Sequence, residues 1–167
     1  MEDVQVETSK VKNAAAEKES VKTRKTRKLL VKTLKKMGCQ PVIETENENS
    51  VSFFFQGEKM TVYVYDYWLV IWDYFLIAVN LDDIEDFSRL RKAVNIANAD
   101  CFVTVMYYVN KEDGLAHVNA KTSLMFTSDF PDYEKYLFLQ LRSFFPAQRV
   151  IELELDRMRR NDGALSK

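Results

Sequence analysis

The sequence predicts an α+β fold in which helices cover an antiparallel sheet. Apolar residues recur with helical spacing near both ends of the chain and in its middle, and alternate with polar residues in between. The expected order is therefore one helix, three to five strands, a second helix, two strands and a closing helix. With 47% apolar residues and only four Gly and three Pro, the 167-residue chain can bury a core without a disulfide or a metal. We expect one domain over residues 19–161, with a disordered arm over 1–18 and a disordered tail over 162–167.

The first helix is expected to begin near Ser20 and to end at Gly38. Glycine is common where a helix ends in a left-handed turn. The apolar residues of this segment fall near one helical face: Val21, Leu30, Leu34 and Met37.

Extended segments follow between residues 41 and 79. In order they read PVIETE, SVSFFFQ, KMTVYVY, WLVIW and FLIAV, and most are rich in β-branched and aromatic residues. Gly57 with Glu58 is expected to connect the second segment to the third, because glycine supplies the positive φ of a tight hairpin. Asp66 with Tyr67 is expected to make the next turn.

Residues 60–79 have the length of a membrane-spanning helix, but their composition argues against one. Asp66 and Asp73 lie within this run, and each would cost about 2.5–3.5 kcal/mol near the centre of a bilayer. We therefore expect strands and no membrane span. The acidic start of the chain, which no apolar run follows, predicts a cytoplasmic protein.

The second helix is expected over LDDIEDFSRLRKAVNIAN. Asp82 or Asp83 can cap its free N–H groups, and Glu85 and Asp86 favour the positive end of its dipole. We interpret these acids as capping residues rather than metal ligands, because the glycine and distal glutamate of a calcium loop are missing.

A strand pair and a closing helix complete the order. Residues 101–109 and 116–126 are expected to pair around a turn at 110–114. The closing helix is expected over 131–160. Pro146 predicts a kink or two helices there, because proline removes a helical hydrogen bond and clashes with the preceding turn.

The sequence offers few groups for catalysis. His117 is the single histidine, and no serine or cysteine near it forms a nucleophile motif. Cys39 and Cys101 lack metal-binding spacing and are expected to be buried thiols. The four glycines are scattered and form no phosphate-binding loop. We therefore expect a protein that is not an enzyme, with no catalytic residue, metal or cofactor.

Charge divides the chain into two unlike parts. Residues 1–36 carry a net charge of +6 and residues 37–167 a net charge of −7. The stretch KTRKTRK, residues 22–28, could contact phosphates, so a regulator that binds nucleic acid through the first helix is kept as the alternative function. We favour a solvated helix face, because no aromatic residue interleaves these charges for base stacking.

Aromatic residues are the more unusual feature. Trp68, Trp72, Tyr74 and Phe75 lie close together on successive strand segments, and alternation prevents all of them from facing the helices. An exposed aromatic patch on a sheet is typical of a protein-binding surface, so these four residues form the candidate site. The alternative is a second buried layer made by the arm, by the third helix or by a second copy of the chain.

Two long stretches resemble a known family. They are IWDYFLIAVNLDDIEDFSRLRKAVNIAN and LMFTSDFPDYEKYLFLQLRSFFPAQRVIELELDRMR, which contain the aspartate-led helix with Asn95 and Asn98 and the segment FFPAQR. Over about residues 20–160 the chain resembles the bacterial YbjN-like proteins, called sensory-transduction-regulator-like, which share the fold of type III secretion chaperones. The resemblance implies this α+β order and a binder of other proteins, often dimeric, with no catalytic residues to carry over.

Together these observations predict a non-enzymatic, chaperone- or regulator-like module that binds a protein or peptide client. The four-three apolar steps of the closing helix and the excess of aromatics add a homodimer as a second expectation.

Overall fold

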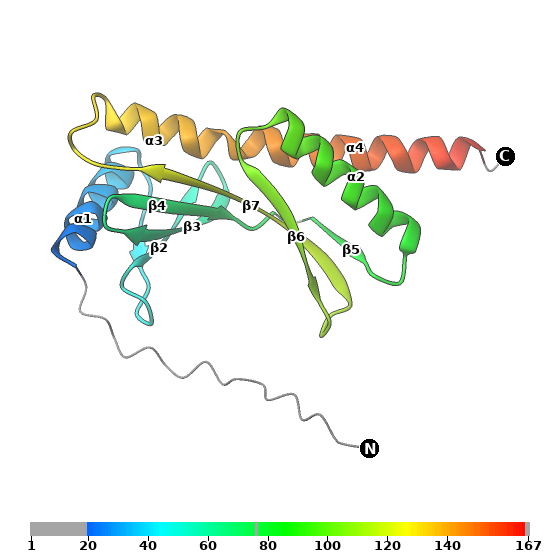
Figure 1. The fold of residues 1–167 in the computed structure, drawn as a ribbon, viewed down its shortest axis with the longest axis horizontal. Helices are drawn as coiled ribbons and strands as arrows, with labels where there is room; N and C mark the ends of the chain where they lie inside the picture. The colour runs from blue at the N-terminus through cyan, green and yellow to red at the C-terminus, as the bar shows by residue number, and fades with distance from the viewer. Residues whose placement is uncertain (1–19, 76, 166–167) are drawn as a thin grey trace, which may run out of the picture.

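The structure is a computed structural model that describes residues 20–75 and 77–165 (Figure 1). The predicted arm over residues 1–18 lies outside the described residues. The elements in chain order are α1 (Val21–Lys36), β1 (Val42–Ile43), β2 (Ser50–Phe55), β3 (Glu58–Tyr65), β4 (Trp68–Asp73), β5 (Ala78–Asn80), α2 (Ile84–Asp100), β6 (Thr104–Asn110), β7 (Leu115–Met125), α3 (Tyr133–Arg142) and α4 (Phe144–Leu165). The predicted α+β order is confirmed, with five strands before the second helix.

All of these strands belong to one antiparallel sheet. The strand order is β1-β2-β3-β4-β7-β5, and β6 also pairs with β7. β4 and β5 pair with successive parts of β7, while β6 pairs with the opposite edge of the same strand. The long strand β7 therefore joins the two halves of the sheet.

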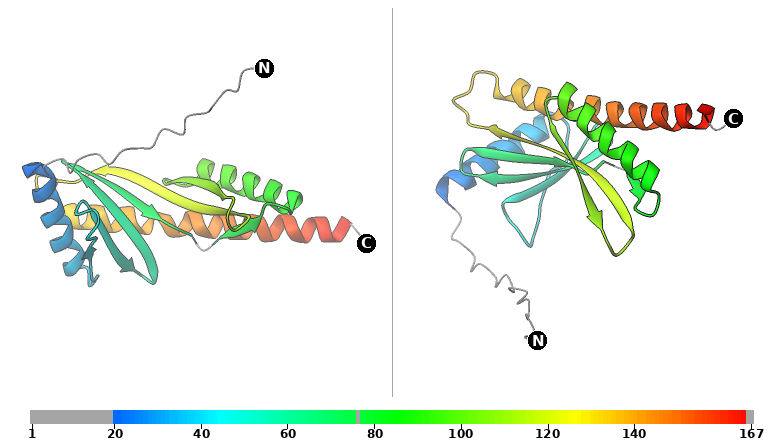
Figure 2. Two further views of the ribbon diagram at one scale, coloured as in Figure 1. Left: turned by 90° about the horizontal axis from the view of Figure 1, so that it is seen from below. Right: turned by 45° about the vertical axis from the view of Figure 1, so that its right-hand side comes forward.

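The helices pack on one face of this sheet. Phe87 of α2 meets Tyr107 of β6 edge to face, with ring centres 5.4 Å apart, and Phe138 of α3 meets Phe55 of β2 in the same way at 5.8 Å. Figure 2 shows α3 and α4 running end to end along one side of the strands. This helix-covered side holds the core, whose largest fully buried side chains include Met60, Leu69, Ile71, Leu90, Phe126, Phe144 and Ile151.

Two tight hairpins connect the neighbouring strands β2, β3 and β4. Gln56 and Gly57 both have positive φ, 51° and 95°, and form a two-residue turn between Phe55 and Glu58. Such turns match the natural twist of the strands. The predicted connection is thus shifted by one residue, because Glu58 already pairs as the first residue of β3.

The next hairpin turn is anchored to the start of α1. Ser20 caps α1 by accepting a hydrogen bond from the Thr23 N–H at 3.0 Å. The Asp66 carboxylate accepts hydrogen bonds from the Ser20 hydroxyl and, at 3.1 Å, from the Thr23 hydroxyl. The Asp66 N–H donates to Thr23 Oγ1 at 2.9 Å. These bonds, first the one from Ser20, lower the pKa of Asp66 below its ordinary value.

The closing segment forms two helices, as Pro146 predicted, and their junction lies at Ser143, three residues before the proline. Pro146 has no N–H to donate to the Arg142 carbonyl, so the helical ladder is interrupted there, and the Ser143 hydroxyl donates instead to the Gln140 carbonyl at 2.6 Å. Pro146 is the third residue of α4, where its missing N–H is tolerated, because the first N–H groups of a helix have no partner within the helix.

Helix α4 also runs further than the predicted domain boundary at residue 161, and residues 162–165, expected in a disordered tail, are helical. Ion pairs to α2 account for this. Arg89 donates to Asp162 at 2.8 Å, and Arg159 donates twice to Asp86, at 2.8 and 2.6 Å. Arg159 and then Arg89 hold the pKa of Asp86 below its ordinary value, so the acidic start of α2 serves helix packing as well as capping.

Asn98 pairs with one residue on the free edge of β6. Its side-chain amide donates to the Val105 carbonyl at 2.9 Å and accepts from the Val105 N–H at 2.8 Å. An unpaired strand edge invites pairing with other chains, and this clamp satisfies the free edge of β6 at Val105.

We expect Asp66→Asn to lower the melting temperature at pH 7. Asparagine tolerates the positive φ of this position, so the substitution removes the charge-assisted bonds without adding backbone strain. The depressed pKa of Asp66 means that its contribution is present above the pKa of the unfolded chain and is lost as the pH falls through the folded pKa. Thermal melts from pH 7 to pH 2 should therefore show the gap to the parent protein closing on acidification. Asp129→Asn, which removes an exposed charge, is the control and should show no such gap.

Candidate protein-binding face

The sheet face opposite the helices carries a group of aromatic side chains, which we call the outer aromatic face. Strand alternation places every second residue of β3, β4 and β6 on this side. Its aromatic members are Tyr63, Tyr65, Trp68, Trp72, Tyr74 and Tyr108. No helix of the described part packs over them, and four of the six are exposed: Tyr65, Trp68, Tyr74 and Tyr108.

The centre of this face is a stack of rings. Trp72 and Tyr74 lie nearly parallel, at 10°, with ring centres 6.2 Å apart. The Lys121 ammonium lies 5.4 Å from the centre of the Trp72 ring, a cation–π contact that holds the indole in place. Burial and the neighbouring Tyr63 raise the pKa of Tyr74. The surface of this cluster is therefore mostly apolar ring, with the Tyr74 hydroxyl and the Lys121 ammonium as polar groups at its rim.

Tyr65 and Trp68 extend the face toward the β3–β4 turn. They stand opposite each other in the register of the two strands. At the other end, Tyr108 stacks on His117 with ring centres 5.2 Å apart, and His117 Nε2 lies 2.8 Å from Asp113 Oδ2. His117 thus takes part in a surface stack at the β6–β7 hairpin.

Three of the four predicted site residues lie on this face, and one does not. Trp68, Trp72 and Tyr74 point outward, whereas Phe75 is 4% exposed and belongs to the core. The reason is parity. Tyr74 continues the outward series of Trp68 and Trp72, so Phe75 must point inward. The prediction that alternation keeps some of these rings away from the helices is confirmed, but Phe75 is not a surface residue.

Sequence reasoning missed Tyr63, Tyr65 and Tyr108. The alternation in KMTVYVY could have indicated the first two. Tyr63 and Tyr65 lie on the face of the strand opposite to the buried Val62 and Val64. Tyr108 joins the face only because β6 pairs with β7, which no local pattern specifies.

One buried carboxyl lies on the inner face behind this cluster. Asp73 is 1% exposed, and neither of its side-chain oxygens has a hydrogen-bond partner among the described residues. Burial, followed by repulsion from Glu58, raises its pKa to about 7. An unpaired buried carboxyl is a cost to the fold, since the charged form is poorly solvated there.

The other reactive side chains do not form a cluster. Cys39 and Cys101 are free thiols that are half-buried rather than fully buried as predicted, and desolvation raises the pKa of both. Among the described residues, no three His, Cys, Asp or Glu side chains come together as metal ligands. Within the same part of the chain, no helix is long and apolar enough to cross a membrane.

These features define an α+β module whose sheet has one face covered by helices and one aromatic face. Comparison with known structures identifies proteins with a similar fold. The sequence matches no family model and no curated protein sequence. The structure is similar to that of YbjN from E. coli, which has been suggested to be a transcription regulator, with 14% identity and a TM-score of 0.51 over 80% of this chain and 93% of that one. It is also similar to an uncharacterized protein from Methanothermobacter thermautotrophicus, with 12% identity and a TM-score of 0.56 over 80% of this chain and 98% of that one. The chain therefore has a YbjN-like fold, as the sequence resemblance implied.

We expect Asp73→Asn to stabilise the protein at pH 8. Between about pH 4 and pH 7 the folded state holds a proton on Asp73 that the unfolded state has released, so this group makes stability fall as the pH rises. The loss is complete above about pH 7 and amounts to about 4 kcal/mol, because the pKa rises from 3.8 to about 7 and each pKa unit corresponds to about 1.4 kcal/mol. Urea unfolding at pH 5 and pH 8 should show a much smaller difference for the variant. An equal difference in the variant and in the exposed-site control Glu112→Gln would show that Asp73 does not carry this dependence.

Proposed function

We propose that this chain is a non-enzymatic, chaperone- or regulator-like module that captures a segment of another protein on its outer aromatic face. The observation that carries the proposal is the exposure of Trp and Tyr rings on a sheet face that the described helices leave uncovered. Residence in the bacterial cytoplasm remains a prediction from the sequence.

Tyrosine and tryptophan suit such a face because they supply large contact area with few rotatable bonds. They dominate measured binding hot spots for this reason, and their polar groups keep the free surface soluble. Trp72 is already held by Tyr74 and Lys121, so little side-chain entropy remains to be lost when a partner covers it. A few anchors of this kind would set the affinity of the complex.

Replacing Trp68 or Trp72 by Ser should weaken capture of the partner by about 30-fold, since a hot-spot ring contributes about 2 kcal/mol or more. The measurement is affinity capture from the native cell with quantitative mass spectrometry, followed by titration of the captured protein. Leu139→Ser, which removes an exposed apolar side chain from α3 on the helix side, is the control and should retain the partner.

Light scattering on the same variants shows whether the face binds a client protein or a second copy of the chain. A dimer that Trp68→Ser dissociates would assign the face to self-association. Retention of every partner by both tryptophan variants, with melting temperatures near that of the parent, would show that this face is not the binding site.

A second candidate is a regulator that contacts nucleic acid through α1. This helix carries eight Lys and Arg and no acidic residue, and Lys22 lies 5.3 Å from the ring centre of Tyr67, an aromatic neighbour that only the fold brings near. The suggested role of E. coli YbjN in transcription adds to this candidate. It ranks second because Arg27 and Lys36 are already paired with Glu48 and Glu134.

Salt dependence tests this second candidate. If α1 neutralises about four phosphates, affinity for duplex DNA should fall by about 100-fold between 50 and 200 mM salt. Lys25→Glu should weaken binding further, while Lys92→Glu on α2 should not. If the gel-shift titration shows no salt-dependent complex, the nucleic-acid candidate is excluded and only the protein-binding proposal remains.

A further inference from the structure

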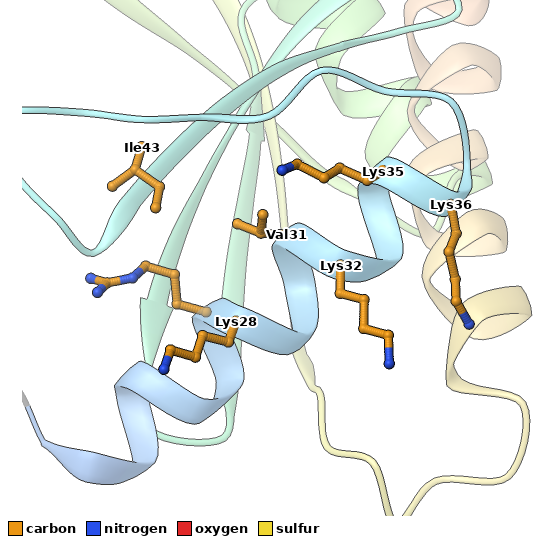
Figure 3. Close-up of a pocket in the computed structure, with 7 residues that line it drawn as sticks. Lys28, Val31, Lys32, Lys35, Lys36 and Ile43 are labelled. Carbon is orange, nitrogen blue, oxygen red and sulfur yellow. The ribbon is translucent and has the colours of Figure 1, made fainter.

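A groove lies between α1 and the edge strand β1, away from the outer aromatic face. It is a hollow of about 620 Å³ that is widely open to solvent and has a mostly apolar lining, and we call it the basic groove. Figure 3 shows Val31 and Lys35 projecting from α1 toward Ile43, with Lys28 on the same side and Lys32 and Lys36 on the other flank of the helix. The groove thus combines an apolar floor with a cationic rim.

The floor is exposed because the sheet ends there. β1 is only two residues long and pairs with β2 alone, so nothing in the described chain covers its outer side. Ile43 is 43% exposed, and Val31 of α1 is half-buried. Two β-branched side chains are therefore left facing solvent from neighbouring elements.

The rim retains uncompensated positive charge. Arg27 donates to the Glu48 carbonyl at 2.6 Å, and Lys36 pairs with Glu134. In contrast, Lys28, Lys32 and Lys35 form no ion pair with any described residue. Lysines placed above an apolar floor attract an anionic partner and strengthen its contacts as water leaves the groove.

The combination discriminates among anionic partners. A nucleic acid backbone would use the lysines but not Val31 and Ile43, and single strands are usually held by aromatic stacking, which the groove lining lacks. Acidic side chains interspersed with apolar ones match both the rim and the floor.

We propose that the basic groove binds an acidic peptide segment of a partner protein, with its apolar side chains on Val31 and Ile43 and its carboxylates on Lys28 and Lys35. The site is distinct from the outer aromatic face, so the two assignments stand or fall separately. The 16 residues of α1 span about 24 Å, which an extended segment of about seven residues covers.

The test uses labelled peptides and fluorescence anisotropy on the full chain. The main probe is a decapeptide of alternating Glu and Leu, and the comparison probes are decaglutamate, a decapeptide of alternating Lys and Leu, and a ten-residue deoxythymidine strand. The Glu/Leu peptide should bind at least tenfold more tightly than each comparison probe. Its affinity should also decrease with added salt, as expected for exposed ion pairs.

Variants locate the binding. Ile43→Glu and the double variant Lys28→Glu with Lys35→Glu should each weaken the Glu/Leu peptide by at least tenfold. The charge-matched control, Lys92→Glu with Lys111→Glu, lies on α2 and the β6–β7 turn and should stay within twofold of the parent. All of the substituted side chains are exposed, and circular dichroism with thermal melts checks that each variant is folded.

Several results would overturn the proposal. Equal binding of decaglutamate or deoxythymidine would show a general polyanion surface, and binding of the main probe that Ile43→Glu does not weaken would exclude this groove. Absence of binding to the Glu/Leu peptide, or binding only to vesicles of phosphatidylcholine with 30% phosphatidylserine, would also exclude it. The triple variant Glu2→Gln, Asp3→Asn, Glu7→Gln addresses the chain's own acidic start: a tenfold gain in affinity would identify that segment as the occupant instead of a partner.

Discussion

Burial of one sheet face by all the helices is the constraint on which the rest of this molecule depends. Side chains alternate along a strand, so when one face of the sheet forms the core, every second side chain of each strand points to the opposite face. The inward series of β4, Leu69 and Ile71, is fully buried, while Trp68 and Trp72 are sent outward. The aromatic face is therefore produced by the same pattern that builds the core.

Polar contacts then fix how the helices sit on the sheet. Asp66 joins a hairpin turn to the N-terminus of α1, where a negative charge also meets the positive end of the helix dipole. Asp86 performs a comparable task between α2 and α4 by accepting two hydrogen bonds from Arg159. In both places an acid that could be taken for a ligand or a catalytic group is occupied by the packing of the fold.

The sequence predicts the elements well because their signals are local. Period-two alternation identifies β3, and aspartates mark the start of α2, where Asp83 accepts from the Asp86 N–H at 2.8 Å. Pro146 predicted a break in the closing segment, and the break between α3 and α4 falls three residues earlier, at Ser143. It falls there because the missing Pro146 N–H leaves the Arg142 carbonyl without its helical partner and proline itself is tolerated in the first turn of α4.

The candidate sites were less predictable because they depend on pairing between distant segments. Parity alone could have removed Phe75 from the exposed set, since it is one residue out of step with Trp72 and Tyr74. Tyr108 could not have been added without knowing that β6 and β4 flank the same strand. The basic groove is still less visible, because Val31 continues a helical apolar pattern and Ile43 begins a strand, and only tertiary packing leaves both open to solvent.

The two proposed surfaces depend on different interactions, apolar burial and electrostatic attraction. They lie on opposite faces of the sheet at its edge strand, β1. Val42 pairs with Ser52 and Ile43 with Val51, so neighbouring residues of β1 point to the outer face and to the α1 side. Contacts on the aromatic face depend on buried area and change little with salt, whereas the lysines of the groove act through charges that are screened over about 8 Å at physiological ionic strength. A partner that used both surfaces would therefore lose only part of its affinity at high salt, and the remaining part would combine the contribution of the rings with that of Val31 and Ile43 on the groove floor.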